Sequence, residues 1–562
     1  MPVRRPLRPA AVLVTLSLVL AACQGSASES PGGSGVPQPS SSATGGSVRI
    51  GYGGSPDSLN PGLALLSEAY QMFELVYDTP IEVLPDGSYA PELATSWEVS
   101  DDALTYTLHL VDNAVFHDGT PMTSEDVKFS LELYRDNVEF PYMSSYSDVF
   151  PTIEAPDPTT VVMTSETPIG NFEYRMIFMY VLPKHIWENE DPLEFPNEEM
   201  IGTGPFMMAE YAQNEFVRLA ANKDHWDIPP IVDELIWQTI ENGDARVAAI
   251  TNGEIDMITE FPTTAMPTLE GAENVQVVTS DSIASALTDI FFNVIDPDEC
   301  PADGVCSGHP ALRDLAVRQA LASATNKQEL LDVATFGLGT LGVSLVPPGQ
   351  VDFFVGADAG QPFDVDAANQ QLDDAGYEDS DGDGIRECLP DQDCDTLTFR
   401  LNFPDDSDAG PREAEILQAQ WGEVGVALEI QTLDADTLTA VCCPAFDFDV
   451  IMWGWGPDPD PQFLLGVALC ANIENGFNET GYCNEDYEAL YEEQAVEPDH
   501  DTRVGIIKEM QEILLEDVPY IIPYYYGSTQ AYRTDTFTGW NTDPVGFGLD
   551  DISSLAFIRP VE

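Results

Sequence analysis

The segment 397–433 constrains the fold more than any other part of the chain. It reads as a strand, "LTFRLNF" (397–403), a helix, "PREAEILQAQWGEVG" (411–425), and a second strand, "VALEIQTL" (426–433). Pro411 suits the first turn of a helix, and Gly425 suits its end. A strand, a helix and a strand in this order predict two parallel strands joined by a crossover helix. We therefore expect an α/β fold with a parallel sheet.

A further strand, "FDFDVIMWGW", runs into the loop "MWGWGPDPDPQF" (452–463). Glycine and proline mark a loop, but they do not explain two tryptophans beside two aspartates. Strand alternation places Trp453 and Trp455 on one face, so at least one of them could belong to the core. In open α/β sheets, ligands bind at the carboxyl ends of strands. The loop could therefore be a surface turn, a metal loop, a carboxylate pair or the mouth of a ligand site.

The N-terminus has the layout of an export signal. Three arginines precede the apolar run 10–22, which is too short for a stable membrane anchor and predicts a signal peptide over 1–22. The run ends in "LAAC", which resembles a lipobox and predicts lipidation of Cys23. Residues 23–46 are rich in Ser, Gly and Pro, so we expect a lipid-anchored flexible linker. The alternative is an ordinary cleaved signal with a chance cysteine.

The chain carries 97 acidic against 21 basic residues, a formal net charge of −76. Nucleic-acid binding needs a basic surface, so this composition argues against it. Because the acidic residues are spread along the whole chain, we interpret them as a surface kept hydrated in high salt. The alternative interpretation is a cationic ligand.

Eight cysteines remain if Cys23 carries lipid, an even number in an exported protein. Cys300 with Cys306 and Cys388 with Cys394 each close a short loop. An adjacent pair bonds to itself only with strain. We therefore expect Cys442 and Cys443 to bond to Cys470 and Cys483, in a connectivity that the sequence leaves open. A zinc site is the alternative, but no CxxC pair and no nearby histidine supports it.

Several motifs together resemble the family 5 solute-binding proteins, the oligopeptide, dipeptide and nickel receptors of ABC importers. The first is "APELATSWEVSDDALTYTLHLVDNAVFHDGTPMTSEDVKFS" (90–130). The others are "GTGPF" (202–206), "FFNV" (291–294), "LRDLAVRQALASATN" (312–326), "PFDVDAANQQLDDAGY" (362–377) and "WGWGPDPDP" (453–461). The resemblance covers nearly all of the chain after the linker.

The resemblance implies a periplasmic-binding-protein-like fold, with two α/β lobes, two hinge strands and an inserted domain. Ligand would be enclosed between the lobes by hinge closure. The expected ranges are 47–80, 196–291 and 521–562 for lobe I, 81–195 for the inserted domain, and 292–520 for lobe II. It also implies a transport receptor and not an enzyme, a monomer that needs no cofactor, and a partner in the permease subunits of an importer.

In the peptide receptors of this family, an aspartate of the cleft loop pairs with the ligand's α-ammonium group, and the matching residue here is Asp458. Trp453 and Trp455 would supply apolar walls, with Gly454 allowing close backbone approach. Gly53, Gly54 and Ser55 would face the ligand from the other lobe. The dipeptide receptors carry an arginine where this chain reads "FPDDSDAG" (403–410). Longer peptides therefore fit better than strict dipeptides, and oligosaccharides are the alternative ligand. Nickel as a ligand is disfavoured, because neither the segment 403–410 nor the cleft loop contains a histidine.

Three other features have a chemical interpretation. Asp379, Asp381 and Asp383 alternate as in the first half of a calcium loop, although Pro390 stands where the bidentate glutamate belongs. Glu387, Asp391 or Asp393 would then have to substitute for that glutamate. A structural calcium ion or an acidic turn would both fit.

"FHDGTP", with His117 beside Asp118, looks catalytic, but no nucleophile motif accompanies it. The competing functions are a secreted hydrolase that uses Asp458 and Asp460, and a calcium-dependent adhesion protein.

Overall fold

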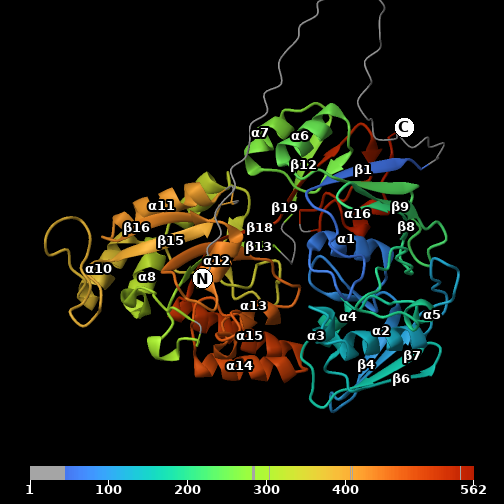
Figure 1. The fold of residues 1–562 in the computed structure, drawn as a ribbon, viewed down its shortest axis with the longest axis horizontal. Coiled ribbons are helices and arrows are strands. Elements are labelled where there is room, and N and C mark those ends of the chain that lie inside the picture. The colour runs from blue at the N-terminus through green and yellow to red at the C-terminus, as the bar shows by residue number, and fades with distance from the viewer. Residues whose placement is uncertain are drawn as a thin grey trace, which may run out of the picture. The chain divides into compact units, whose positions relative to one another are not determined.

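The computed structural model describes residues 45–280, 285–302, 304–405, 407, 409–544 and 546–561. The signal peptide, the lipidation site at Cys23 and the linker up to residue 44 therefore lie outside the described residues. Three sheets of four or more strands organise the described chain (Figure 1). No helix in the described ranges combines the length and the apolar character needed to cross a bilayer.

The first α/β lobe is built on a seven-stranded sheet. Its strand order is β12 (Val275–Ser280), β19 (Ser528–Arg533), β11 (Met257–Ile258), β1 (Ser47–Tyr52), β10 (Glu234–Thr239), β9 (Phe216–Ala221) and β8 (Phe206–Ala212). β1 is parallel to both β10 and β11, whereas the outer pairs are antiparallel. The accompanying elements are α1 (Ser67–Val76), α6 (Gly243–Asn252), α7 (Met266–Glu270), α16 (Ile552–Leu555) and the pair β20 (Phe537–Thr538) and β21 (Arg559–Pro560).

The second lobe is built on a six-stranded sheet. Its order is β14 (Thr340–Leu341), β18 (Tyr520–Tyr526), β13 (Ala286–Phe292), β17 (Val450–Trp455), β15 (Thr398–Pro404) and β16 (Ala427–Leu433). β15 and β16 are parallel and are joined by α11 (Gly410–Gly422), which has Pro411 in its first turn. The predicted strand–helix–strand unit is thus confirmed. Gly425 follows the helix with a positive φ of 79°, a conformation in which glycine is favoured.

Helices cover both faces of this sheet (Figure 1). They are α8 (Leu315–Ala324), α9 (Lys327–Glu329), α10 (Val365–Ala375), α12 (Ala435–Cys442), α13 (Gln462–Gly466), α14 (Glu485–Val496) and α15 (His500–Asp517). Side chains of β13 alternate between two hydrophobic clusters. Ile290 and Phe292 belong to one cluster, and Leu287 and Phe291 belong to the other. Since successive side chains of a strand point to opposite faces, this alternation shows that β13 is buried on both sides.

The inserted region carries an antiparallel sheet of four strands, β4 (Ala94–Val99), β5 (Thr105–Leu110), β7 (Thr160–Thr164) and β6 (Thr152–Asp157). Its other elements are β2 (Ile81–Val83), β3 (Tyr89–Pro91), α2 (Ser124–Asp136), α3 (Met143–Ser147), α4 (Phe172–Met176) and α5 (Lys184–Trp187). Thr123 precedes α2 as its cap, and its N–H donates to the Asp126 carboxylate at 2.9 Å.

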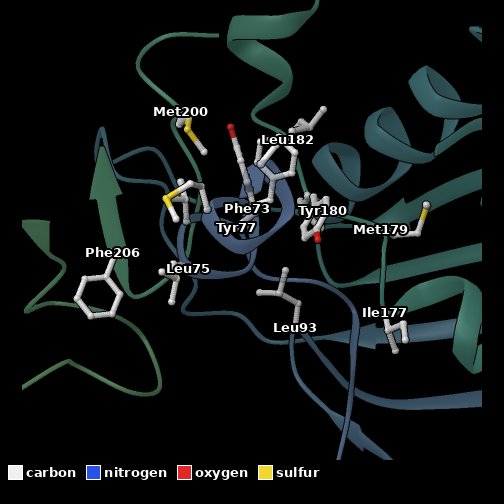
Figure 2. Close-up of a cluster of buried hydrophobic side chains, with 14 of the residues drawn as sticks. Phe73, Leu75, Tyr77, Leu93, Ile177, Met179, Tyr180, Leu182, Met200 and Phe206 are labelled. Carbon is white, nitrogen blue, oxygen red and sulfur yellow. The ribbon is translucent and has the colours of Figure 1, made fainter. Parts of the chain in front are cut away.

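One hydrophobic core joins the inserted region to the first lobe. Figure 2 shows Phe73 of α1 and Tyr77, which directly follows α1, beside Tyr180 of the inserted region, with Met200 and Phe206 near them. The ring centres of Phe73 and Tyr180 are 5.6 Å apart, in the edge-to-face arrangement that aromatic pairs prefer. The inserted region is therefore packed onto lobe I and does not stand on a separate core.

The expected lobe boundaries at 291/292 and 520/521 are wrong by several residues. β13 and β18 both belong to the sheet of the second lobe, where Leu287 pairs with Tyr525. The chain therefore leaves the first sheet after Ser280, where β12 ends, and returns at Gly527, between β18 and β19. The reason is that strand pairing, and not the position of a family motif, decides to which sheet a residue belongs.

Candidate functional site

A cavity of about 590 Å³ lies where the two large sheets meet. Its wall includes Thr279 and Ser280 at the end of β12, Thr529 of β19, and the carboxyl ends of β15, β17 and β18. This volume is in the range of small-molecule sites. The cavity lies at the carboxyl ends of strands, as the sheet topology predicted.

Trp453, Gly454 and Trp455, three of the predicted site residues, line this cavity. Both tryptophans are half-buried and also pack against the hydrophobic core of the second lobe. The indole N–H of Trp455 donates to Glu479 Oε1 at 2.9 Å, which holds the ring in place. A Cβ on Gly454 would lie 2.4 Å from the carbonyl oxygen of Leu287, so only glycine fits there. The close approach predicted for Gly454 is thus to the neighbouring strand β13.

The backbone of β17 is paired unequally on its two sides. β13 runs beside it as far as Trp455, but β15 pairs only with Val450 and Ile451. Met452 to Trp455 therefore have no strand partner on the β15 side among the described residues, and these four residues line the cavity. Exposed strand edges offer N–H and C=O groups to an added strand.

Asp458 does not line the cavity, although it lies only three residues beyond Trp455. Its carboxylate accepts a hydrogen bond from the hydroxyl of Tyr174, which belongs to the inserted region. Its carbonyl oxygen accepts from Gln350 Nε2 at 2.6 Å. Within the described ranges, no basic side chain forms an ion pair with it. Burial, with a smaller contribution from the charge of Asp460, raises the pKa of Asp458 to about 6, although the Tyr174 hydrogen bond opposes this shift.

Asp460 is buried and bound to Arg503. It therefore does not share a substrate-facing position with Asp458. An acid/base pair must present both carboxyl groups to one bond, so this arrangement does not support the hydrolase alternative.

Gly53, Gly54 and Ser55 lie outside the cavity wall. A Cβ on Gly53 would be 2.3 Å from Glu260 Oε1, and one on Gly54 would be 1.9 Å from Glu68 Oε1. The Ser55 hydroxyl accepts the N–H of Asn214 at 3.1 Å. These residues therefore contact groups of their own lobe, and the role of facing a ligand stays a prediction.

The cavity also contains residues that the sequence did not reveal. Glu413, on the first turn of α11, is only 4% exposed, and the hydroxyl of Tyr524 donates to its carboxylate. Burial raises the pKa of Glu413, while the Tyr524 hydrogen bond and the charge of Arg412 oppose the shift. Glu413 and Tyr524 are 111 residues apart in sequence. For Glu413 and Tyr524, the only indication in the sequence was the aromatic stretch "YIIPYYY" (520–526).

His117 is a structural residue, as expected. Its Nδ1 accepts the N–H of Gly202 at 3.2 Å and its Nε2 donates to the carbonyl of Gly204 at 2.9 Å, which attaches this turn to "GTGPF". Asp118 does not bond to His117 but lies 2.7 Å from His185 Nε2. The structure therefore shows no His117–Asp118 dyad.

The proposed calcium loop brings together two of the three expected aspartates and Glu387, one of the expected substitutes for the missing bidentate ligand. Carboxylate oxygens of Asp379, Asp381 and Glu387 lie within 4.8 Å of one another, and Asp383 is outside this group. Asp383 instead accepts the N–H of Ile385 at 2.8 Å. Asp379 likewise accepts the N–H groups of Gly382 and Gly384. Calcium binding at this loop stays a prediction.

Two of the expected disulfides are present, Cys300–Cys306 and Cys388–Cys394. The expected bonds between Cys442 or Cys443 and the other two cysteines are wrong, because the structure pairs Cys470 with Cys483 and Cys442 with Cys443. The Asn478 amide donates to the carbonyls of Leu469 and Tyr482, at 2.9 and 2.7 Å, and so brings the two ends of the 470–483 loop together.

A histidine lies near one of the cysteine pairs, contrary to the expectation. His309 Nε2 is 3.9 Å from Cys388 Sγ. Because Cys388 is bonded to Cys394, neither of these two sulfurs is a free thiolate that could bind zinc.

Comparisons with known proteins agree with this architecture. The model of the bacterial extracellular solute-binding proteins, family 5 (middle part), matches residues 88–475. The oligopeptide-binding protein AppA of Bacillus subtilis is 24% identical over 533 residues, 92% of this chain and 93% of the relative. The dipeptide-binding protein of Escherichia coli is 25% identical over 526 residues, 88% of this chain and 91% of the relative. The structure of Bacillus subtilis AppA in complex with a nonapeptide matches with a TM-score of 0.72 at 22% identity, covering 92% of this chain and all of that chain.

Proposed function

Because the chain belongs to the bacterial extracellular solute-binding proteins of family 5, we propose that it is the substrate-binding protein of an ABC importer that takes up peptides. It acts outside the cytoplasm, as members of this family do, and delivers its ligand to the membrane permease subunits. The two long relatives are named for binding oligopeptides and dipeptides. Oligopeptides suit this chain better than strict dipeptides. A strict dipeptide receptor would need a cation for the C-terminal carboxylate of its ligand. Arg412, on the first turn of α11, donates to the carbonyl of Ala334 and is not part of the cavity wall, so it does not supply this cation.

The observation that carries this proposal is the half-paired strand β17. Its residues Met452 to Trp455 border the cavity and lack a strand on the β15 side. An extended peptide laid along this edge would complete the sheet through main-chain hydrogen bonds, which recognise peptides of many sequences.

Asp458 completes the proposed site by binding the α-ammonium group of the peptide. A half-buried carboxylate without a cation is costly, and the Asp458 carboxylate has only the Tyr174 hydroxyl as its side-chain partner among the described residues. Closure of the lobes on a ligand would bring the ammonium group to Asp458 and displace this hydroxyl.

The proposal is tested by identifying and then replacing the ligand. Mass spectrometry of material that co-purifies with the chain should find peptides. After ligand removal, titration calorimetry should show binding of free-amine oligopeptides, and N-methylation of alternate peptide amides should weaken it by removing main-chain donors. The recovery of non-peptide ligands alone, or the lack of any effect of N-methylation, would contradict the proposal.

An oligosaccharide receptor is the second candidate. Two tryptophans and many hydroxyl groups line the cavity, and aromatic faces with hydroxyl partners suit sugar rings. Binding of oligosaccharides but not peptides, with loss in Trp455→Ala, would favour it. In either case, lipid on Cys23 as the membrane anchor, a monomeric state and a structural calcium ion at Asp379 and Asp381 remain parts of the proposal.

A further inference from the structure

The cavity wall has a one-sided charge composition. Among the described residues of the wall, Glu413 is the only acidic one, and none is a lysine, arginine or histidine. The remaining polar groups are hydroxyls, those of Thr263, Thr279, Ser280, Thr288, Thr335, Ser407, Tyr524, Tyr526 and Thr529.

Glu413 is held without a cation in the wall to balance it. Within the described part of the chain, its carboxylate accepts a hydrogen bond from the Tyr524 hydroxyl. Arg412, the next residue, points to the other side: it donates to the carbonyl of Ala334 at 2.6 Å and lies 5.2 Å from the centre of the Phe336 ring. A buried carboxylate is stabilised strongly by a nearby cation, and the cavity is where such a cation could come from.

The aromatic part of the wall favours the same kind of ligand group. Trp453, Trp455 and Tyr526 line the cavity, and the faces of such rings attract cations. Behind this wall, Glu479 accepts the indole N–H of Trp455, and Asp289 of β13 is fully buried. A carboxylate group on the ligand would meet the aromatic faces, Glu413 and no basic group.

We infer that the cavity is a subsite for an alkylammonium or guanidinium group of the ligand, the basic side chain of a bound peptide. This inference rests on the proposed peptide-binding function and narrows it to peptides with lysine or arginine. Glu413 and the aromatic walls bind the cation, and the hydroxyls replace its water. The net charge of −76 also raises the local concentration of cations at the protein surface.

The test compares peptides of one length and backbone that differ at one side chain: lysine, arginine, uncharged norleucine or glutamate. Calorimetry on ligand-free protein should show lysine and arginine peptides binding at least about tenfold more tightly than the norleucine peptide, and the glutamate peptide binding most weakly. Equal or tighter binding of the glutamate peptide would overturn the inference. If no peptide binds, the proposed function fails, and spermidine and cadaverine then decide: their binding supports a cation subsite, and its absence overturns it.

A matched pair of variants locates the subsite. Glu413→Gln keeps the shape of the side chain and an acceptor for Tyr524 but removes the charge. Glu415→Gln, on the same helix, changes an exposed carboxylate. We expect Glu413→Gln to lower the affinity for the lysine peptide about ten- to a hundredfold and to leave the affinity for the norleucine peptide unchanged. Glu415→Gln should change neither affinity. Equal weakening of both peptides by Glu413→Gln, with circular dichroism as for the unmodified protein, would show a structural role and overturn the assignment.

Discussion

Asp460 and Arg503, both of the second lobe, form a buried two-pronged ion pair. Arg503 Nη1 lies 2.6 Å from Asp460 Oδ2, and Nη2 lies 2.7 Å from Oδ1. The two side chains are 2% and 3% exposed, respectively. Asp460 and Arg503 are 43 residues apart in the chain, so local sequence did not indicate that they pair.

Asp460→Ala should lower the free energy of unfolding by about 3–5 kcal/mol, because it leaves the Arg503 guanidinium buried and unpaired. Chemical denaturation followed by circular dichroism measures this change. Glu210→Gln, which removes a partner of the more exposed Arg218, is the control and should cost less than about 1 kcal/mol. Similar small losses in both variants would show that Arg503 finds other partners.

Asp458→Asn should weaken the binding of free-amine peptides by about 2–5 kcal/mol and the binding of N-acetylated peptides far less, since only the free-amine peptides carry the α-ammonium charge. The two titrations by calorimetry give the difference directly. Equal losses for both peptides would mean that Asp458 shapes the loop only.

The same residue should make binding depend on pH. The pKa of Asp458 in the ligand-free protein is raised to about 6 by burial, so the carboxylate is ionised above this pH and neutral below it. Affinity for a free-amine peptide should therefore fall by up to about tenfold per pH unit as the pH drops below about 6. An N-acetylated peptide is the control. A flat profile for the free-amine peptide would contradict the assigned ion pair.

Asp289→Asn should stabilise the protein as the pH rises. Asp289 is fully buried, its carboxylate oxygens lack a well-formed hydrogen bond, and burial raises its pKa to about 7. The folded state favours the neutral carboxyl group of Asp289. The stability that this group contributes is therefore fully present below its pKa in the unfolded chain, about 3.9. This stability is lost as the pH rises through the folded-state pKa of about 7. The variant should therefore gain at least about 1 kcal/mol over the parent between pH 5 and 8, measured by denaturation at each pH. Parallel stability curves would refute this expectation.

Cys23→Ser tests the anchor, which lies outside the described residues. The motif "LAAC" followed by the linker predicts that the variant is released into the medium or left unprocessed. Cell fractionation and mass spectrometry of the N-terminus measure both outcomes. A variant that is processed and membrane-bound like the parent would show that lipid on Cys23 is not the anchor.

Local patterns were enough to predict one strand–helix–strand unit of the second lobe. The residue pattern of 397–433 predicted β15, α11 and β16. These features depend on neighbours within a few residues, so the sequence displays them directly. The family motifs supplied the two-lobe architecture, and they also indicated the Trp453–Trp455 wall of the cavity.

The sequence by itself determined the element types, the family and one wall of the cavity. The tertiary structure decided which distant groups meet: Glu413 with Tyr524, Asp460 with Arg503, Tyr174 with Asp458, and Cys470 with Cys483 rather than with Cys442 or Cys443. It also moved β13 and β18 into the second sheet. The physical reason is that hydrophobic periodicity reports whether a side chain is buried. Which partner balances its charge depends on strand pairing and helix packing between segments that lie far apart in the chain.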